Sequence, residues 1–156
     1  MAYAPPRRSQ MDAAIDHGES PLVAMDEVAF ERMLALLFEK RPFLPYPILQ
    51  AARTDAISSA ASNQRVWNEQ LKDRYLLDER IGKLRTPVLV LWGEADRLFD
   101  ASGAEALRAQ ATHAQVQLLP GIGHLPMTEA PKPTARVYAA FIEQLPRGAQ
   151  APRSGE

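Results

Sequence analysis

The apolar and polar positions of the chain divide it into two halves. From Asp26 onward, apolar residues recur three and four positions apart, which is the stripe of an amphipathic helix: Phe30, Met33, Leu34, Leu37 and Phe38. Asp26 or Glu27 suits the start of this helix, because a carboxylate can accept from its free amides. Three prolines over residues 42–47 then end the helix. Two further helices are expected, one from 47 to 62 and one around Trp67.

The second half alternates strands with helices. Residues 86–92 form an apolar run that ends at Gly93, which is typical of a parallel strand covered on both faces. We expect a helix over 101–111, a short strand over 115–119 and a last helix over 133–145. This order is that of the end of a doubly wound α/β sheet. Because two strands alone leave an open edge, we expect the C-terminal part of a larger domain, an incomplete sheet.

Four segments follow from this pattern. Residues 1–25 form an irregular arm, because prolines and glycines there allow only a short helix over residues 10–17. Residues 26–80 form a helical cap, and residues 81–146 form the βαβα part of the core. The remaining ten residues, 147–156, form a disordered tail.

Composition and charge narrow the function classes. The chain has 18 Lys and Arg against 19 Asp and Glu, so it lacks a broad positive field for nucleic acid. It has no Cys, which excludes disulfides, thiol nucleophiles and Cys-ligated metals. No apolar run approaches the roughly 20 residues of a transmembrane helix, and no apolar segment follows Arg7 and Arg8 as in a signal peptide. We therefore expect a cytoplasmic location.

Two loops hold the candidate catalytic residues. Asp96 follows the first strand in Gly93-Glu-Ala-Asp, and His124 follows the second in Gly121-Ile-Gly-His. Parallel neighbours have their carboxyl ends side by side, so these two side chains are expected to meet. An Asp that accepts from one imidazole nitrogen leaves the other free as a general base. Each residue alone is more often a turn or loop residue, but the order of the motifs favours catalysis.

That order resembles the α/β-hydrolase superfamily, in which the triad runs Ser, then Asp or Glu, then His. The resemblance implies that Asp96 is the acid and His124 the base. Three segments resemble the helical cap of lipases and esterases similar to monoacylglycerol lipase: Gly18-Glu-Ser-Pro-Leu-Val, Phe30-Glu-Arg-Met-Leu and Arg41-Pro-Phe-Leu-Pro. The resemblance implies a serine hydrolase that acts on a small-molecule or lipid-like carboxylic ester without a cofactor.

The nucleophile of such a triad is missing from the sequence. No Gly-x-Ser-x-Gly occurs, and Gly18-Glu-Ser20-Pro21-Leu places a proline where the nucleophile turn needs a free backbone. Ser102 is expected to open a helix, and Asp100 to cap it. The His-Gly segment of the oxyanion hole is also absent. We therefore expect this chain to be inactive alone.

Other residues have candidate roles in binding or packing. Apolar side chains near the cap could line an acyl pocket or equally dock the cap on the core: Phe38, Phe43, Leu44, Tyr46 and Ile48, with Leu125 beside the histidine. Trp67 and Trp92 are expected to pack in the core or against the lid. His17 and His113 are expected on the surface, and no carboxylates around them suggest a metal site.

Two alternatives stay open at this point. The chain could be a non-catalytic truncated or partner polypeptide that completes its sheet by pairing with another lobe, another chain or a second copy. It could also belong to a hydrolase of another reaction type, such as an epoxide hydrolase, dehalogenase or haloperoxidase, since these resemble the same Asp and His half. The cap favours ester hydrolysis.

Overall fold

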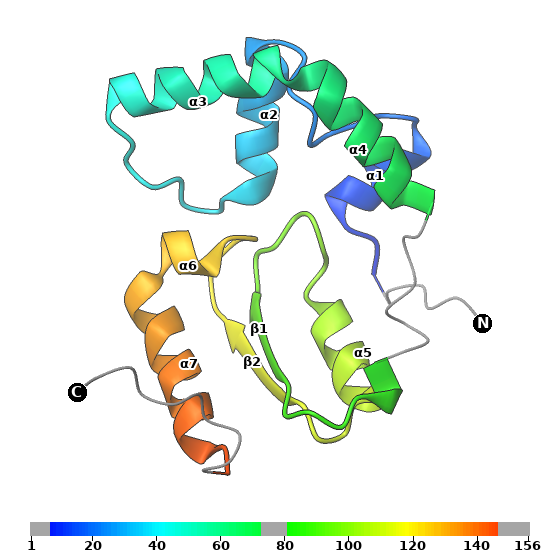
Figure 1. Cartoon of the computed structure of the whole chain (residues 1–156), viewed down its shortest axis with the longest axis vertical. Coiled ribbons are helices and arrows are strands. Elements are labelled where there is room, and N and C mark those ends of the chain that lie inside the picture. The colour runs from blue at the N-terminus through cyan, green and yellow to red at the C-terminus, as the bar shows by residue number, and fades with distance from the viewer. Residues whose placement is uncertain (1–6, 73–80, 147–156) are drawn as a thin grey trace.

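A computed structural model of the chain describes residues 7–72 and 81–146. Helices α1 to α4 form one layer, which lies over the end of a small sheet flanked by α5 and α7 (Figure 1). Residues 73–80 of the expected cap and the expected tail 147–156 lie outside the described residues.

The first half contains helices only in its described part, and the second half alternates. The helical layer comprises α1 (Gln10–Asp16), α2 (Glu27–Leu37), α3 (Tyr46–Ser58) and α4 (Ala60–Lys72). The second half comprises a 3₁₀ turn η1 (Ile81–Lys83), β1 (Leu89–Gly93), α5 (Ser102–Gln110), β2 (Gln115–Leu119), α6 (Pro126–Glu129) and α7 (Pro131–Gln144).

Side-chain caps define the starts of the first two helices. Ser9 and Asp12 form a reciprocal capping box at α1, in which the Ser9 hydroxyl accepts from the Asp12 amide at 3.0 Å. Asp26 caps α2, because its carboxylate accepts from the Ala29 amide at 2.7 Å. The expected short first helix and the acidic cap at Asp26 are therefore confirmed.

Several expected boundaries are wrong. The helix expected over 47–62 spans a break at Ser59, where α3 ends and α4 begins. No proline or glycine marks this break. Directly after it, α4 buries Ala60 and Trp67 in the core shared with α1. The first strand begins at Leu89 rather than at Thr86, since Pro87 has no amide to donate to a ladder.

Two more differences lie in the second half. Helix α6 lies where the sequence pattern predicted no element, and its Pro126 occupies the first helical position, where a missing amide costs nothing. Helix α7 begins at Pro131, before the expected start at residue 133, for the same reason. The second strand has the expected bounds, 115–119.

The sheet consists of two parallel strands in the described part of the chain. β1 pairs with β2 from Leu89↔Gln115 to Gly93↔Leu119. Helix α5 covers one face and α7 the other (Figure 1). On the α5 side the buried cluster is Ile81, Val90, Ala104, Ala111 and Ala114. Each strand has only one strand neighbour here, so one edge of each is open.

A second cluster connects the loop after β1 with the helical layer. Leu98, from this loop, is buried with Met11, Val23, Ala60 and Trp67. The loop also caps α1, because the carbonyl oxygen of Arg97 accepts from the Gln10 and Met11 amides at 3.1 and 3.3 Å. The loop that carries Asp96 is therefore held by both layers.

Candidate active site

Backbone hydrogen bonds fix the carboxylate of Asp96. Its Oδ1 accepts from the amides of Leu98 at 2.8 Å and Phe99 at 3.0 Å, in the loop that follows β1. The side chain is only 4% exposed. Such an Asx turn leaves the second oxygen, Oδ2, available for a partner outside the loop.

A close approach of two backbones sets the distance between the two loops. The Ala95 amide donates to Ile122 O at 2.9 Å. A Cβ atom added to Gly93 would lie 2.0 Å from Gly123 O, so no other residue fits there. Gly121 has a φ of +64°, in the left-handed region that favours glycine. The glycines in both motifs therefore have a structural reason.

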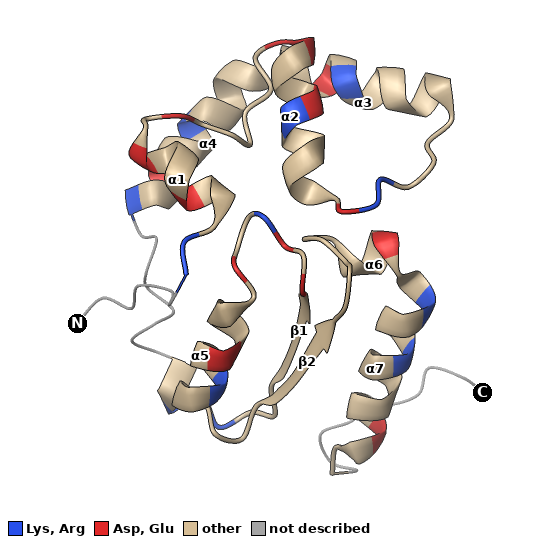
Figure 2. Ribbon diagram, turned by 180° about the vertical axis from the view of Figure 1, so that it is seen from behind, with Lys and Arg blue, Asp and Glu red and all other residues tan. Residues whose placement is uncertain are grey.

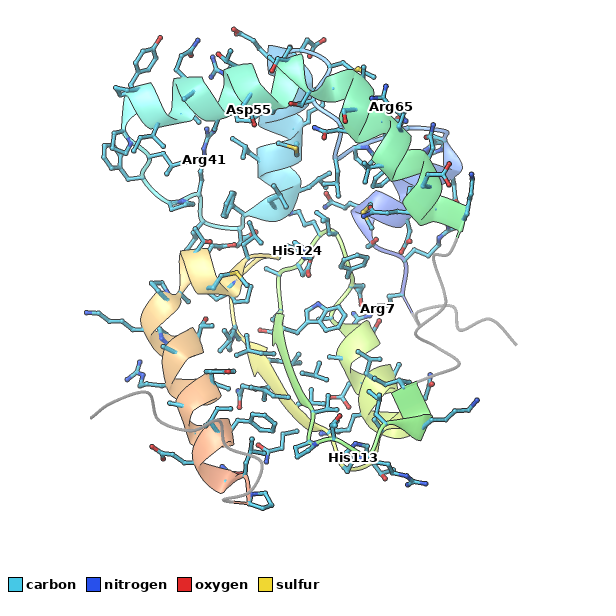
Figure 3. All side chains as sticks on the ribbon, viewed as in Figure 1. Arg7, Arg41, Asp55, Arg65, His113 and His124 are labelled. Carbon is cyan, nitrogen blue, oxygen red and sulfur yellow. The ribbon has the colours of Figure 1, made fainter. Side chains whose placement is uncertain are left out.

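The two candidate catalytic residues meet at this edge of the sheet. His124 Nδ1 lies 2.9 Å from Asp96 Oδ2. Because an ionised carboxylate can only accept, Nδ1 donates, and in the neutral imidazole Nε2 then carries no proton and can act as a base. The imidazole side chain is 26% exposed. Figure 3 shows His124 next to the helical layer and His113 at the opposite end of the strands.

A cavity of about 190 Å³ lies beside this pair. Its lining residues are Leu91, Trp92, Gly93, Asp96, Phe99, His124 and Pro126. The Phe99 ring lies 5.4 Å from the imidazole between centroids, and the Trp92 indole donates to Phe99 O at 3.0 Å. An aromatic wall therefore adjoins His124. Sequence reasoning missed Phe99 and Pro126, although both follow the motif residues Asp96 and His124 within three positions.

None of the six apolar residues considered for an acyl pocket lines this cavity, and Tyr46 and Ile48 are exposed. Phe38 packs with the cluster around Phe30 in the helical layer, and Phe43 is 90% exposed. Leu44 and Leu125 are half-buried. A role for these side chains in substrate binding stays a prediction.

Neither serine considered above lines the cavity beside His124. Ser20 lines a separate cavity of about 520 Å³, and its hydroxyl accepts from the Gln64 amide group at 2.9 Å. Ser102 is the first residue of α5, as expected. The expectation that Asp100 caps this helix is wrong, because Ala101 occupies the N-cap position and no side chain caps the helix there, although the Ser102 amide donates to Asp100 Oδ1 at 2.9 Å. Burial raises the pKa of Asp100, but hydrogen bonds from Ser102 and the nearby Arg7 guanidinium outweigh it and hold that pKa below its ordinary value.

The remaining predicted residues lie away from the pair. His17 and His113 are exposed, and Trp67 is buried in the core shared with α1. Within residues 7–72 and 81–146, no group of three or more His, Asp or Glu side chains is placed to hold a metal ion. No helix in these same ranges has the length and apolar content to cross a membrane.

The sequence model of the Alpha/beta hydrolase family matches residues 2–137. The chain belongs to this family. Among relatives, monoacylglycerol lipase ABHD6 of Rattus norvegicus is 31% identical over 127 residues, which cover 80% of this chain and 38% of the relative. Lipase 3 of Moraxella sp. (strain TA144) is 29% identical and is covered to 40%. The chain thus spans less than half the length of these hydrolases.

Solved structures agree on the fold. A structure titled as a membrane phospholipase A, a novel bacterial virulence factor, superimposes with a TM-score of 0.84 at 33% identity, over 92% of this chain and 46% of the other. A putative lipase from Acinetobacter baumannii AYE gives 0.79 at 20% identity, over 92% and 50%. The expected fold class, an incomplete α/β-hydrolase sheet with helices, is confirmed.

Proposed function

We propose that this α/β hydrolase chain carries the acid and the base of a serine hydrolase that acts on carboxylic esters. The hydrogen bond between His124 Nδ1 and Asp96 Oδ2 carries the proposal, because it lies at the carboxyl ends of the strands and beside a cavity. Lipases among the relatives favour ester hydrolysis over the epoxide and haloalkane reactions of the superfamily.

In this proposal the serine comes from the lobe that this chain lacks. The serine hydroxyl attacks the ester carbonyl while His124 Nε2 takes its proton, and Asp96 stabilises the resulting imidazolium. The imidazolium then returns the proton to the leaving alcohol. Water, deprotonated by the same nitrogen, attacks the acyl-enzyme, and the serine regains its proton as the acid leaves.

The open edge of β1 is where we expect the lobe with the serine to pair. Within the residues that the structure describes, β1 pairs with β2 alone, and relatives such as the rat lipase are more than twice as long as the matched segment. A further parallel strand on the free edge would extend the sheet and cover backbone groups that are otherwise unpaired. A second copy of this chain, or a separate partner polypeptide, is the alternative occupant.

The substrate class we propose is a lipid-like ester. Trp92, Phe99 and Leu91 give the cavity beside His124 apolar walls, which suit an acyl chain more than a charged group. Relatives named as lipases support the same class. The cytoplasmic location stays a prediction.

The test is to translate the DNA that precedes the Met1 codon and to express the longer protein. We expect a Gly-x-Ser-x-Gly segment there and hydrolysis of p-nitrophenyl esters, whereas this chain alone shows none. Esters of short and long acyl chains compare the substrate classes, and a haloalkane and an epoxide serve as competing substrates. A longer protein without that serine, or one that cleaves only the epoxide or haloalkane, contradicts the proposal.

A further inference from the structure

The C-terminal end of α2, residues 35–40, contacts both loops of the His124 and Asp96 pair. We name this segment the α2 end. On one side, the His124 amide donates to Leu37 O at 3.0 Å. On the other side, the Arg97 guanidinium donates to Ala35 O at 2.8 Å and pairs with the Glu39 carboxylate. The two loops are therefore connected through the helical layer as well as directly.

Glu129 at the end of α6 completes this connection. Its Oε1 accepts from the amides of Gly123 at 2.9 Å and Glu39 at 3.2 Å, and its Oε2 accepts from the Lys40 amide at 2.9 Å. One carboxylate thus binds three backbone amides from two segments that lie far apart in the sequence, at Gly123 and at Glu39 and Lys40. Figure 2 shows α6, with its acidic residue, facing the turn after α2.

The fit around this carboxylate is tight. A Cβ atom added to Gly123 would lie 2.6 Å from Glu129 Oε1 and 2.7 Å from the Glu39 amide nitrogen. A side chain at position 123 would therefore occupy the space that the Glu129 carboxylate fills. The absence of a side chain at position 123 therefore lets the carboxylate reach the backbone of the residue directly before His124.

We propose that Glu129 is a positioning residue for His124, an inference that rests on the proposed function. Two successive amides of the histidine loop are held, that of Gly123 by Glu129 and that of His124 by Leu37 O. Together they fix the Cα atom from which the imidazole reaches Asp96. A carboxylate is needed because both of its oxygens accept, whereas a glutamine would turn an NH₂ group toward an amide that also donates.

The experiment uses ¹⁵N-labelled chain, whose only histidines are His17, His113 and His124. Long-range ¹H–¹⁵N spectra report the tautomer of each imidazole, and amide exchange reports the hydrogen bonds at the loop. Glu129→Gln is compared with Glu143→Gln, which removes the same charge from an exposed position on α7.

We expect the original chain and Glu143→Gln to keep the proton of His124 on Nδ1. In Glu129→Gln we expect a mixture of tautomers at His124 only, and roughly tenfold faster exchange of the Gly123 and Lys40 amides. In the complete hydrolase the same substitution should lower kcat by about tenfold and leave KM nearly unchanged.

The outcomes separate this inference from the proposed function. A His124 that lacks the Nδ1 proton in the original chain contradicts the pair with Asp96 and the function built on it. An unchanged His124 in Glu129→Gln overturns the role of Glu129 alone. If Glu129→Gln does not fold, Glu129→Asp, which keeps the charge and shortens the reach, is measured in the same way. Unfolding of both variants also overturns the inference, because Glu129 is then a folding determinant.

Discussion

A cluster of ion pairs in the helical layer contrasts with the two carboxylates nearest to His124 in residues 81–146, which we call the sheet half. In the helical layer, Arg41 and Arg53 form ion pairs with Glu31 at 2.7 and 3.2 Å, on side chains that water reaches. In the sheet half, Asp96 and Glu129 instead accept from backbone amides. A backbone amide has few conformations, so these two carboxylates are held in place at a smaller cost in side-chain entropy than an exposed ion pair between two long side chains.

The helical layer also exposes more large apolar side chains than the sheet half does. Helix α3 has no buried residue. Most large apolar side chains that are exposed in the described part of the chain belong to the helical layer and its connections: Met25, Val28, Phe43, Tyr46, Ile48 and Val66. The sheet half therefore supplies the side chains of the site, and the helical layer supplies apolar surface and contacts to both loops through α1, the shared core around Leu98 and the α2 end.

The largest expected effect is that of His124→Ala in the complete hydrolase. Loss of the base should lower kcat by about 10⁴-fold or more, with the melting temperature nearly unchanged. His113→Ala, at the opposite end of the strands, is the matched control and should keep full activity. Ester hydrolysis that survives in His124→Ala would place the base elsewhere.

Gly93→Ala compares the backbone packing of the two halves. The new Cβ atom would overlap Gly123 O, so we expect a loss of about 4 kcal/mol or more in the free energy of unfolding. Gly18→Ala in the helical layer meets no atom within 4 Å, and only its φ of +76° opposes it, at about 1 kcal/mol. Urea unfolding of both variants checks the order. Equal losses would contradict the claim that close backbone approach defines the sheet half.

Leu98→Ala tests the one core that the two halves share. Removal of this buried side chain from the cluster with Met11 and Trp67 should cost about 3 kcal/mol. We expect faster amide exchange in α1 and α4 and little change in α5, since α5 packs in the other cluster. Val28→Ala, on the exposed side of α2, should cost less than about 0.5 kcal/mol. Equal acceleration in α5 would mean that the halves unfold as one unit.

The sequence predicted a boundary best where a proline, glycine or capping residue lies directly beside it. The strand over 115–119 has its expected bounds, because proline and glycine follow it directly. The break at Ser59 left no such signal, because it depends on which residues of α4 enter a distant core. A sequence pattern predicts the local backbone geometry, whereas the angle between α3 and α4 depends on how their side chains pack against other parts of the fold.

The sequence predicted that Asp96 and His124 meet, but it did not predict the residues that surround and hold this pair. Motifs at the ends of parallel strands place both side chains at one edge. The bonds of Glu129 to Glu39 and Lys40 join segments about 90 positions apart, and nothing near Glu129 in the sequence indicates them. Phe99 was missed for a related reason, since its ring faces His124 only after the Asx turn at Asp96 forms.

The smallest expected effect concerns the pH dependence of the helical layer. The hydrogen bond from Arg41 lowers the pKa of Glu31 below its ordinary value of 4.5, although burial acts to raise it. As the pH falls, the unfolded chain therefore takes up the proton first. The stabilisation is complete above about pH 4.5 and is lost as the pH falls through the lower pKa of the folded state.

The Glu31 side chain is 46% exposed, so solvent screens this interaction and it stabilises the fold by only about 0.3 kcal/mol. Glu31→Gln should unfold at a slightly lower urea concentration than the original chain at pH 7, and this difference should shrink as the pH falls below about 4.5. High salt at pH 7 should also remove the difference, since it screens exposed ion pairs. A difference that is undiminished at pH 3 would mean that Glu31 stabilises α2 by packing, and the contrast between an ionic helical layer and a backbone-held sheet half would then be weaker.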